Sequence, residues 1–250
     1  MKNLAVDPGP VVLFDLDGTL TDPFEGITRS IRYALQELGR TPPPPAELSW
    51  CIGPPLLRSF MSLLNPESGA VNGDTPDPVV ADTAVEKEAW EAVRLYRQRF
   101  AEVGMLENQV YEGIPDVLES LSASGWRLFL ATSKPRIYAQ PILKHFGLAT
   151  WFQGIYGSEL DGTHSNKADL LGHILQKESL SPEQAIMVGD RKHDIEGARR
   201  TGLRVLAVSY GYAAPGELAI AGPDAIADSP REIPARLGSL EGRAVSPLLE

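Results

Sequence analysis

Residues Val11–Asp22 read VVLFDLDGTLTD, and the architecture of the chain can be worked out from this segment. It begins with four apolar residues, a composition typical of a strand that is buried on both faces of a parallel sheet. Asp15 follows directly and Asp17 comes two positions later, while Gly18 permits a turn that brings both carboxylates to one place. The alternative is an Asp-Gly turn that carries two solvated acids. Ligands of open α/β sheets bind at such strand ends, so the segment is a candidate functional site.

The rest of the chain divides into a helical block and an alternating block. From Asp22 to about Met105 the apolar spacing is helical and contains no convincing strand. A proline-rich linker at 41–45 and a Pro-, Gly- and Asn-rich loop at 65–77 interrupt this block, which has predicted helices at 26–39, 56–64 and 79–103. In the second block predicted strands at 127–131, 155–156, 186–188 and 205–208 alternate with predicted helices at 115–123, 137–146, 167–177 and 195–201.

This alternation predicts an α/β protein with a Rossmann-like, doubly wound parallel sheet. The helical block follows the first strand, so we expect an α-helical cap domain inserted there, above the carboxyl ends of the strands. We place the core domain in residues 1–21 and 106–240, the cap in residues 22–105 and a loose tail in residues 241–250.

The composition is that of an ordinary soluble globular protein. With 250 residues, of which 43% are hydrophobic, the chain can bury a sizeable core. A formal net charge of −10 makes nucleic acids and anionic membranes unexpected partners. The single cysteine, Cys51, allows no intrachain disulfide, and we predict that it is buried. We see no signal peptide and no long apolar segment, and therefore expect a cytoplasmic protein.

Hydroxyl and lysine side chains stand at two further predicted element ends. Thr132 and Ser133 follow the strand at 127–131, where hydroxyls beside a helix N-terminus can bind an anion. The alternative is that they only cap the next helix. The place of Lys134, in the site or in solvent, stays open. Lys167 begins the helix at 167–177, a position at which a lysine is normally solvated.

Two more acids follow the strand at 186–188. Asp190 and Asp194 belong to the motif GDRKHD at Gly189–Asp194. Carboxylates are ligands that Mg²⁺ prefers, although Asp194 could instead cap the following helix. The sequence has no zinc-type cluster of His and Cys residues.

Four motifs, in this order, resemble those of the phosphatase branch of the haloacid dehalogenase superfamily: FDLDGTLTD, LFLATSKP, SNKADLL and GDRKHD. The resemblance covers nearly the whole chain. It implies that Asp15 is the nucleophile and that Asp17 is the general acid and base, whose backbone carbonyl also binds the metal. It further implies that Thr132 and Ser133 bind the phosphoryl group, which Lys167 neutralises.

The same resemblance implies a Mg²⁺ cofactor. Asp15 and Asp190 would be direct ligands, and Asp194 would bind through water or orient another ligand. In the cap, Ile52–Leu56 (IGPPL) resembles the loop that faces the core in phosphoglycolate-phosphatase-like members. Gly53, Pro54 and Arg58 are therefore predicted to bind substrate, unless the loop is only a helix connector.

The resemblance implies an enzyme, a monomer or homodimer, that hydrolyses a small phosphorylated metabolite through an aspartyl phosphate. Phosphoglycolate is the first candidate substrate and a 5′-nucleotide the second. A phosphomutase of the same fold shares all four motifs and stays open. A dehalogenase does not need Asp17, and a phosphonate hydrolase replaces it. A receiver-like signalling domain, the non-enzymatic alternative, lacks the helical insertion and does not use Asp17 as an acid.

Overall fold

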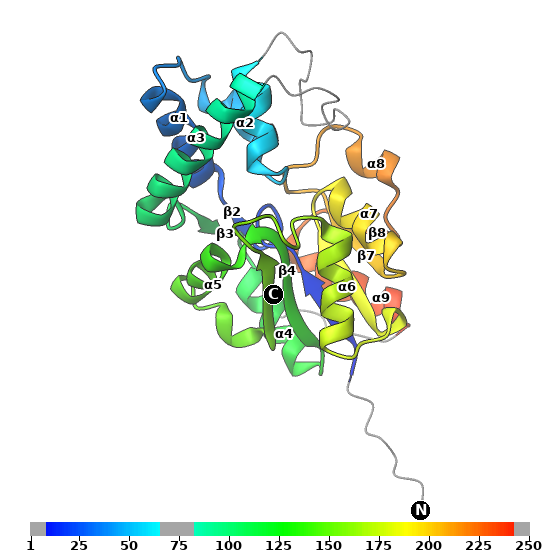
Figure 1. Cartoon of the computed structure of the whole chain (residues 1–250). Coiled ribbons are helices and arrows are strands. Elements are labelled where there is room, and N and C mark those ends of the chain that lie inside the picture. The colour runs from blue at the N-terminus through cyan, green and yellow to red at the C-terminus, as the bar shows by residue number, and fades with distance from the viewer. Residues whose placement is uncertain (1–8, 66–82, 243–250) are drawn as a thin grey trace, which may run out of the picture. The chain divides into compact units, whose positions relative to one another are not determined.

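The structure, a computed structural model, describes residues 9–65 and 83–242 (Figure 1). Contacts divide the chain into one unit of residues 1–20 and 111–250 and another of residues 21–110. The predicted cap, residues 22–105, lies within the second unit, which starts one residue earlier and ends five residues later. Most of the loop predicted at 65–77 and of the tail predicted at 241–250 lies outside the described residues.

A six-stranded sheet forms the framework of the α/β unit, in the order β5-β4-β1-β6-β7-β8. Every neighbouring pair in it is parallel. The strands are β1 (Val11–Phe14), β4 (Arg127–Pro135), β5 (Gly154–Ser158), β6 (Ala185–Gly189), β7 (Arg204–Val208) and β8 (Ala225–Ala227). All four residues of β1 are buried, because β1 lies between β4 and β6 and both of its faces are covered.

Helices pack on both faces of this sheet (Figure 1). On one face lie α6 (Lys167–Lys177), α7 (Lys192–Arg200) and α8 (Glu217–Ala221), which share a core with Val11 and Leu13 of β1. On the other lie α4 (Ile114–Ala123), α5 (Arg136–His145) and α9 (Ile233–Glu241). The chain winds from β1 through β4 to β5 and then returns to β6, so the winding direction reverses beside β1. The predicted doubly wound fold is confirmed, and ligands bind at such a reversal point.

The second unit is mainly helical. It contains α1 (Phe24–Glu37), a 3-10 helix at Pro45–Cys51, α2 (Leu56–Leu64) and α3 (Thr83–Arg99), which continues as a π-helical turn at Phe100–Gly104. A two-residue antiparallel pair, β2 (Thr21–Asp22) with β3 (Gln109–Val110), closes it. Cys51 is buried, as predicted, and burial raises the pKa of its thiol to about 12, which favours the protonated thiol over the nucleophilic thiolate.

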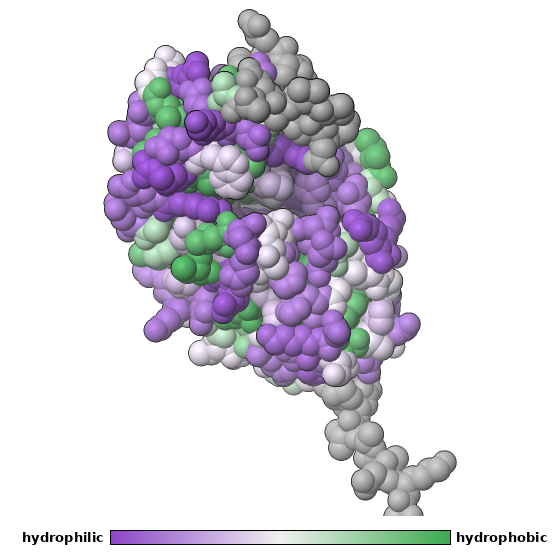
Figure 2. All heavy atoms as spheres, in the orientation of Figure 1, coloured by the Kyte–Doolittle hydropathy of each residue, from purple (hydrophilic) through white to green (hydrophobic). Residues whose placement is uncertain are grey.

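Hydrophilic residues cover most of the face shown in Figure 2, where hydrophobic residues occur only in small, separate patches. The most exposed large hydrophobic side chain among the described residues is Ile220 of α8. No helix in the described part of the chain combines the length and apolar character of a transmembrane span.

Candidate active site

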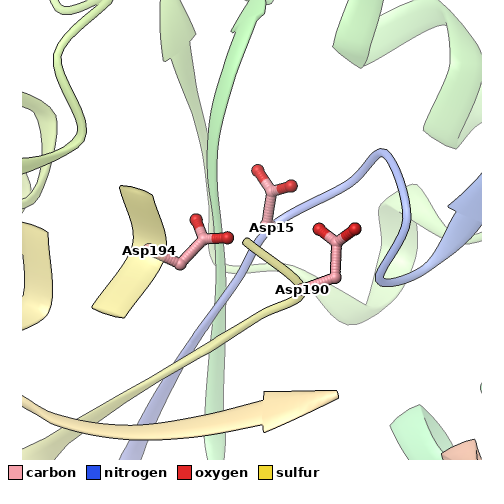
Figure 3. Close-up of side chains that lie close together, drawn as sticks. All are labelled: Asp15, Asp190 and Asp194. Carbon is pink, nitrogen blue, oxygen red and sulfur yellow. The ribbon is translucent and has the colours of Figure 1, made fainter. Parts of the chain in front are cut away.

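Three aspartates converge at the carboxyl ends of β1 and β6 (Figure 3). Asp15 follows β1, Asp190 follows β6, and Asp194 lies in the first turn of α7. One oxygen from each carboxylate lies within 4.8 Å of the others, and all three residues are buried. The Asp15 amide donates to the Val188 carbonyl at 2.9 Å, which extends the pairing of β1 with β6 and fixes the nucleophile candidate beside Asp190.

The chain turns directly after Asp15, as predicted. Gly18 has a φ of 84°, a conformation that side chains disfavour, and the Leu20 amide donates to the Leu16 carbonyl at 2.9 Å. A Cβ at position 18 would lie 2.1 Å from Oδ2 of Asp190. The turn therefore requires glycine for a second reason, which is the close contact with the Asp190 carboxylate. The turn thus fixes the backbone that carries Asp15 and Asp17.

Lys167 lies inside the acidic group rather than in solvent. Its ammonium group donates to Asp15 at 2.8 Å, to Asp194 at 2.7 Å and to the Ala131 carbonyl at 2.9 Å, and the side chain is 4% exposed. The Asn166 side chain accepts from the amides of residues 168 and 169, which caps α6 and fixes where the helix starts. The capped helix therefore delivers the lysine to the carboxyl end of β1.

Burial governs the electrostatics of this cluster. It raises the pKa of Asp15, with Asp194 adding to the effect and Lys167 opposing it. Burial, Asp194 and Asp15 together raise the pKa of Asp190 well above its usual range. Burial alone would lower the pKa of Lys167, but Asp15 and Asp194 raise it above its ordinary value. With all groups ionised, three negative charges and one positive leave a formal charge of −2, which a divalent cation would cancel.

The acidic residues fit a hard divalent cation. Oδ2 of Asp190 accepts from the Tyr212 amide at 2.7 Å, whereas its buried Oδ1 has no hydrogen-bond partner among the described residues. Such an orphaned carboxylate oxygen is costly unless a ligand satisfies it. The donors are all oxygens, as Mg²⁺ prefers. Asp15 and Asp190 are thus suited to direct coordination, and the part played by the Asp17 carbonyl stays a prediction.

Asp194 contributes to the start of α7, one of the two arrangements that its sequence suggested, whereas its role toward a metal stays a prediction. Its Oδ2 accepts from the Arg191 amide at 3.1 Å, which satisfies the start of α7, and its Oδ1 faces Lys167. Arg191 itself is held by Glu217 at 2.9 Å. The helix start is thereby tied to α8, and Asp194 is held at the edge of the acidic group.

The hydroxyls of Thr132 and Ser133 lie in β4. The alternative that they cap α5 is wrong, because the strand continues to Pro135 and that helix has no side-chain cap. Thr132 is 1% exposed, and its hydrogen bond to Asp15 lowers the pKa of that carboxyl against the larger effect of burial. The carbonyl of Ser133 accepts from Ser158, and the phosphate-binding role of its hydroxyl stays a prediction.

Lys134 belongs to this site and not to solvent. Its side chain is 7% exposed and forms an ion pair with Oδ2 of Asp17, whose side chain is 13% exposed. Burial raises the pKa of Asp17, and Lys134 opposes that effect. The general-acid candidate is therefore a largely buried carboxyl group that is paired with a lysine.

The three cap residues proposed from the sequence lie in the second unit. Gly53 is exposed with a φ of 106°, Pro54 is buried, and Arg58 lies half-buried on α2. Their contact with a substrate stays a prediction.

Sequence reasoning missed the loop after β7. The Tyr212 amide binds Asp190, and a Cβ at Gly211 would lie 2.4 Å from both the Asp190 carboxylate and the Gly18 carbonyl. Only glycine fits this contact without displacing the acid. The available signal was the motif SYGY at 209–212, which follows the strand that neighbours β6.

Comparisons with known proteins point to one family. A model described as haloacid dehalogenase-like hydrolase matches residues 12–208. A 5′-nucleotidase from Pseudomonas aeruginosa is 46% identical over 209 residues, which are 84% of this chain and 86% of that protein. The tyrosine-protein kinase PtkA of Mycobacterium tuberculosis is 36% identical over 202 residues, 81% of this chain but only 62% of that relative. A phosphoglycolate phosphatase of Cupriavidus necator is 30% identical over 233 residues, 92% and 94% of the two chains.

The solved structures agree on the fold. A predicted phosphatase from Clostridium acetobutylicum superimposes with a TM-score of 0.81 at 38% identity, over 92% of this chain and 99% of that one.

Proposed function

From the premise that this chain belongs to the haloacid dehalogenase-like hydrolase family, we propose that it hydrolyses phosphate monoesters through an aspartyl phosphate on Asp15, with Mg²⁺ as cofactor. The chain is a phosphatase of this family. The observation that best supports the covalent route is the buried Asp15 carboxylate, held by Lys167 at 2.8 Å at the reversal point of the sheet.

The proposed reaction has two half-reactions. An Asp15 oxygen forms a bond to phosphorus, and the bond from phosphorus to the leaving oxygen breaks while Asp17 gives that oxygen a proton. Asp17 then takes a proton from water, whose oxygen attacks phosphorus and displaces Asp15, which releases inorganic phosphate. Lys167 and Thr132 hold the phosphoryl oxygens, so positioning and charge compensation supply most of the catalysis.

The cation would be held by Asp15 and Asp190, with Asp194 beside them. When bound, it supplies positive charge that keeps the three carboxylates ionised and compensates the phosphate. Lys167 already pairs with Asp15 and Asp194 at 2.8 and 2.7 Å. Its single positive charge therefore cannot neutralise both these carboxylates and a phosphate dianion.

The substrate proposed first is a nucleoside 5′-monophosphate, because the relative with 46% identity is a 5′-nucleotidase. This reverses the order expected from the sequence. Phosphoglycolate is the second candidate, supported by a relative that matches 92% of the chain at 30% identity. Transfer to an acceptor other than water, as in a phosphomutase or as the name PtkA suggests, is the alternative reaction. The cytoplasmic location and the monomeric or homodimeric state remain predictions.

We expect a phosphate-release screen of 5′-nucleotides, phosphoglycolate and sugar phosphates to give the highest kcat/KM with a 5′-nucleotide. The advantage over phosphoglycolate should be about tenfold or more, a difference of about 1.4 kcal/mol in transition-state binding. The Asp15→Asn protein is the negative control, because its phosphate release measures the background of the assay. The nucleotide assignment is wrong if phosphoglycolate is preferred, and hydrolysis itself is wrong if phosphate reaches a second substrate instead of water.

We expect EDTA to abolish activity and Mg²⁺ to restore it. The melting temperature should also rise with Mg²⁺, because a ligand at about a hundred times its Kd stabilises a fold by about 2.7 kcal/mol. Asp190→Ala should lose most of this Mg²⁺-dependent shift, since it removes the oxygen without a partner. Asp194→Asn is the control with the smaller loss, because an amide oxygen still accepts from the Arg191 amide. Full turnover in EDTA, with no metal retained, would contradict the cofactor assignment.

A further inference from the structure

Asp17 is bound through one oxygen only. Its Oδ2 is paired with the Lys134 ammonium group, while its buried Oδ1 has no hydrogen-bond partner among the described residues. A carboxylate held in this way has one fixed atom and one available atom. The proton transfers proposed for Asp17 need such an atom, placed reproducibly next to the leaving oxygen and then next to water.

Lys134 points into the site because β4 is irregular there. The register of β4 with β5 shifts between Thr132 and Pro135, and bulges of this kind redirect side chains beside active sites. The hydroxyl of Thr132 accepts from the Lys134 amide at 3.2 Å, and the hydroxyl of Ser158 donates to the Ser133 carbonyl at 2.7 Å. At Gly157 a Cβ would lie 2.6 Å from the Lys134 carbonyl, so β5 packs tightly against the bulge. The lysine therefore extends from a fixed stretch of backbone.

The two lysines of the site have separate partners. Lys167 contacts Asp15 and Asp194, whereas Lys134 contacts Asp17. Both lysine side chains are nearly buried, at 4% and 7% exposure. A long, flexible side chain is buried at a cost in entropy, so its burial calls for a specific partner.

We propose that Lys134 is the positioning residue of Asp17: it binds Oδ2 and thereby presents Oδ1 for proton transfer. The inference rests on the proposed function in that the benefit of this arrangement is protonation of a leaving oxygen. Lys134 is not proposed to touch the substrate. Its contribution depends on how much protonation the leaving group requires.

The test compares two substrates of similar size, benzyl phosphate and 4-nitrophenyl phosphate. Benzyl alkoxide is a poor leaving group that needs a proton, and 4-nitrophenolate is a good one that hardly does. Lys134→Met should lower kcat on benzyl phosphate by about tenfold or more, part of the 10²- to 10⁴-fold that acid–base catalysis typically contributes. On 4-nitrophenyl phosphate the loss should be about threefold or less, with KM unchanged for both substrates. Lys134→Arg, which keeps charged donors, should recover most of the difference.

A control variant, two contradicting outcomes and a substitute variant complete the test. Lys177→Met, which alters an exposed lysine at the end of α6, should behave as the unchanged protein. Equal losses of kcat on both esters would mean that Lys134 has only a structural role. A rise in KM alone would mean that Lys134 binds the phosphate of the substrate. Either outcome overturns the inference. Lys134→Gln, a neutral donor, provides a second variant if the methionine variant does not fold.

A crystal structure of Lys134→Met gives a reading that does not depend on turnover. We expect the Asp17 carboxylate to be ordered on Lys134 in the unchanged protein and displaced in the variant. An unmoved Asp17 would overturn the inference even if the enzyme is active. No phosphate release from any substrate by the unchanged protein would instead overturn the proposed function, and the crystal structures would still decide the role of Lys134.

Discussion

Replacing Asp15 by Asn should reduce phosphatase activity to background, roughly a thousandfold or more below the unchanged protein. An amide has nearly the shape of the carboxylate but cannot attack phosphorus. Turnover of 4-nitrophenyl phosphate and phosphate release from the preferred substrate measure the loss. If the variant kept a tenth of the turnover, the covalent mechanism would be wrong.

The fold should survive this substitution. Asp15 is one of three buried carboxylates that lie close together, and burial already raises its pKa. Lys167 keeps Asp194 at 2.7 Å and the Ala131 carbonyl at 2.9 Å as partners. The melting temperature in EDTA should therefore be no lower than that of the unchanged protein. A large drop would mean that lost activity reports unfolding, and the kinetic result would then carry no weight.

Repeated local signals explain why much of the fold could be predicted. The bounds of α2 and α6 coincide with the predicted helices at 56–64 and 167–177, where the apolar period is regular. The buried runs of β1 and β6 were equally clear. The short elements were missed: β8 has three residues at the sheet edge, and Ile226 in it is 37% exposed. Strands β2 and β3, with two residues each, leave no period to detect.

The part of the candidate site that lies at the strand ends could be predicted from the geometry of parallel sheets. The carboxyl ends of adjacent parallel strands meet, so Asp15, Thr132 and Asp190 had to lie together once the sheet was inferred. The orientation of Lys134 could not be predicted, because it depends on the register shift in β4. The Tyr212 contact could not be predicted either, because its donor is a backbone amide, which every residue type except proline provides.

Asp17→Asn should separate chemistry that needs a proton from chemistry that does not. The amide oxygen can still accept from Lys134, and the backbone carbonyl is unchanged, so neither the turn nor Mg²⁺ binding should be lost. The proton shuttle disappears, and positioned acid–base catalysis typically contributes about 10² to 10⁴ in rate. Benzyl phosphate should therefore lose activity by about that factor, and 4-nitrophenyl phosphate far less in its first step.

The second half-reaction gives the clearest signature of this variant. With 4-nitrophenyl phosphate the first step still proceeds, but no base remains to activate water, so the phosphate on Asp15 should accumulate. A burst of 4-nitrophenol close to one equivalent of enzyme, then slow turnover, and a covalent phosphate adduct in the mass spectrum are the expected observations. The double variant Asp15→Asn, Asp17→Asn is the control and should show neither burst nor adduct. Equal losses on both esters without a burst would assign Asp17 to structure or to the metal. A burst followed by steady-state turnover as fast as that of the unchanged protein would mean that a group other than Asp17 activates the water.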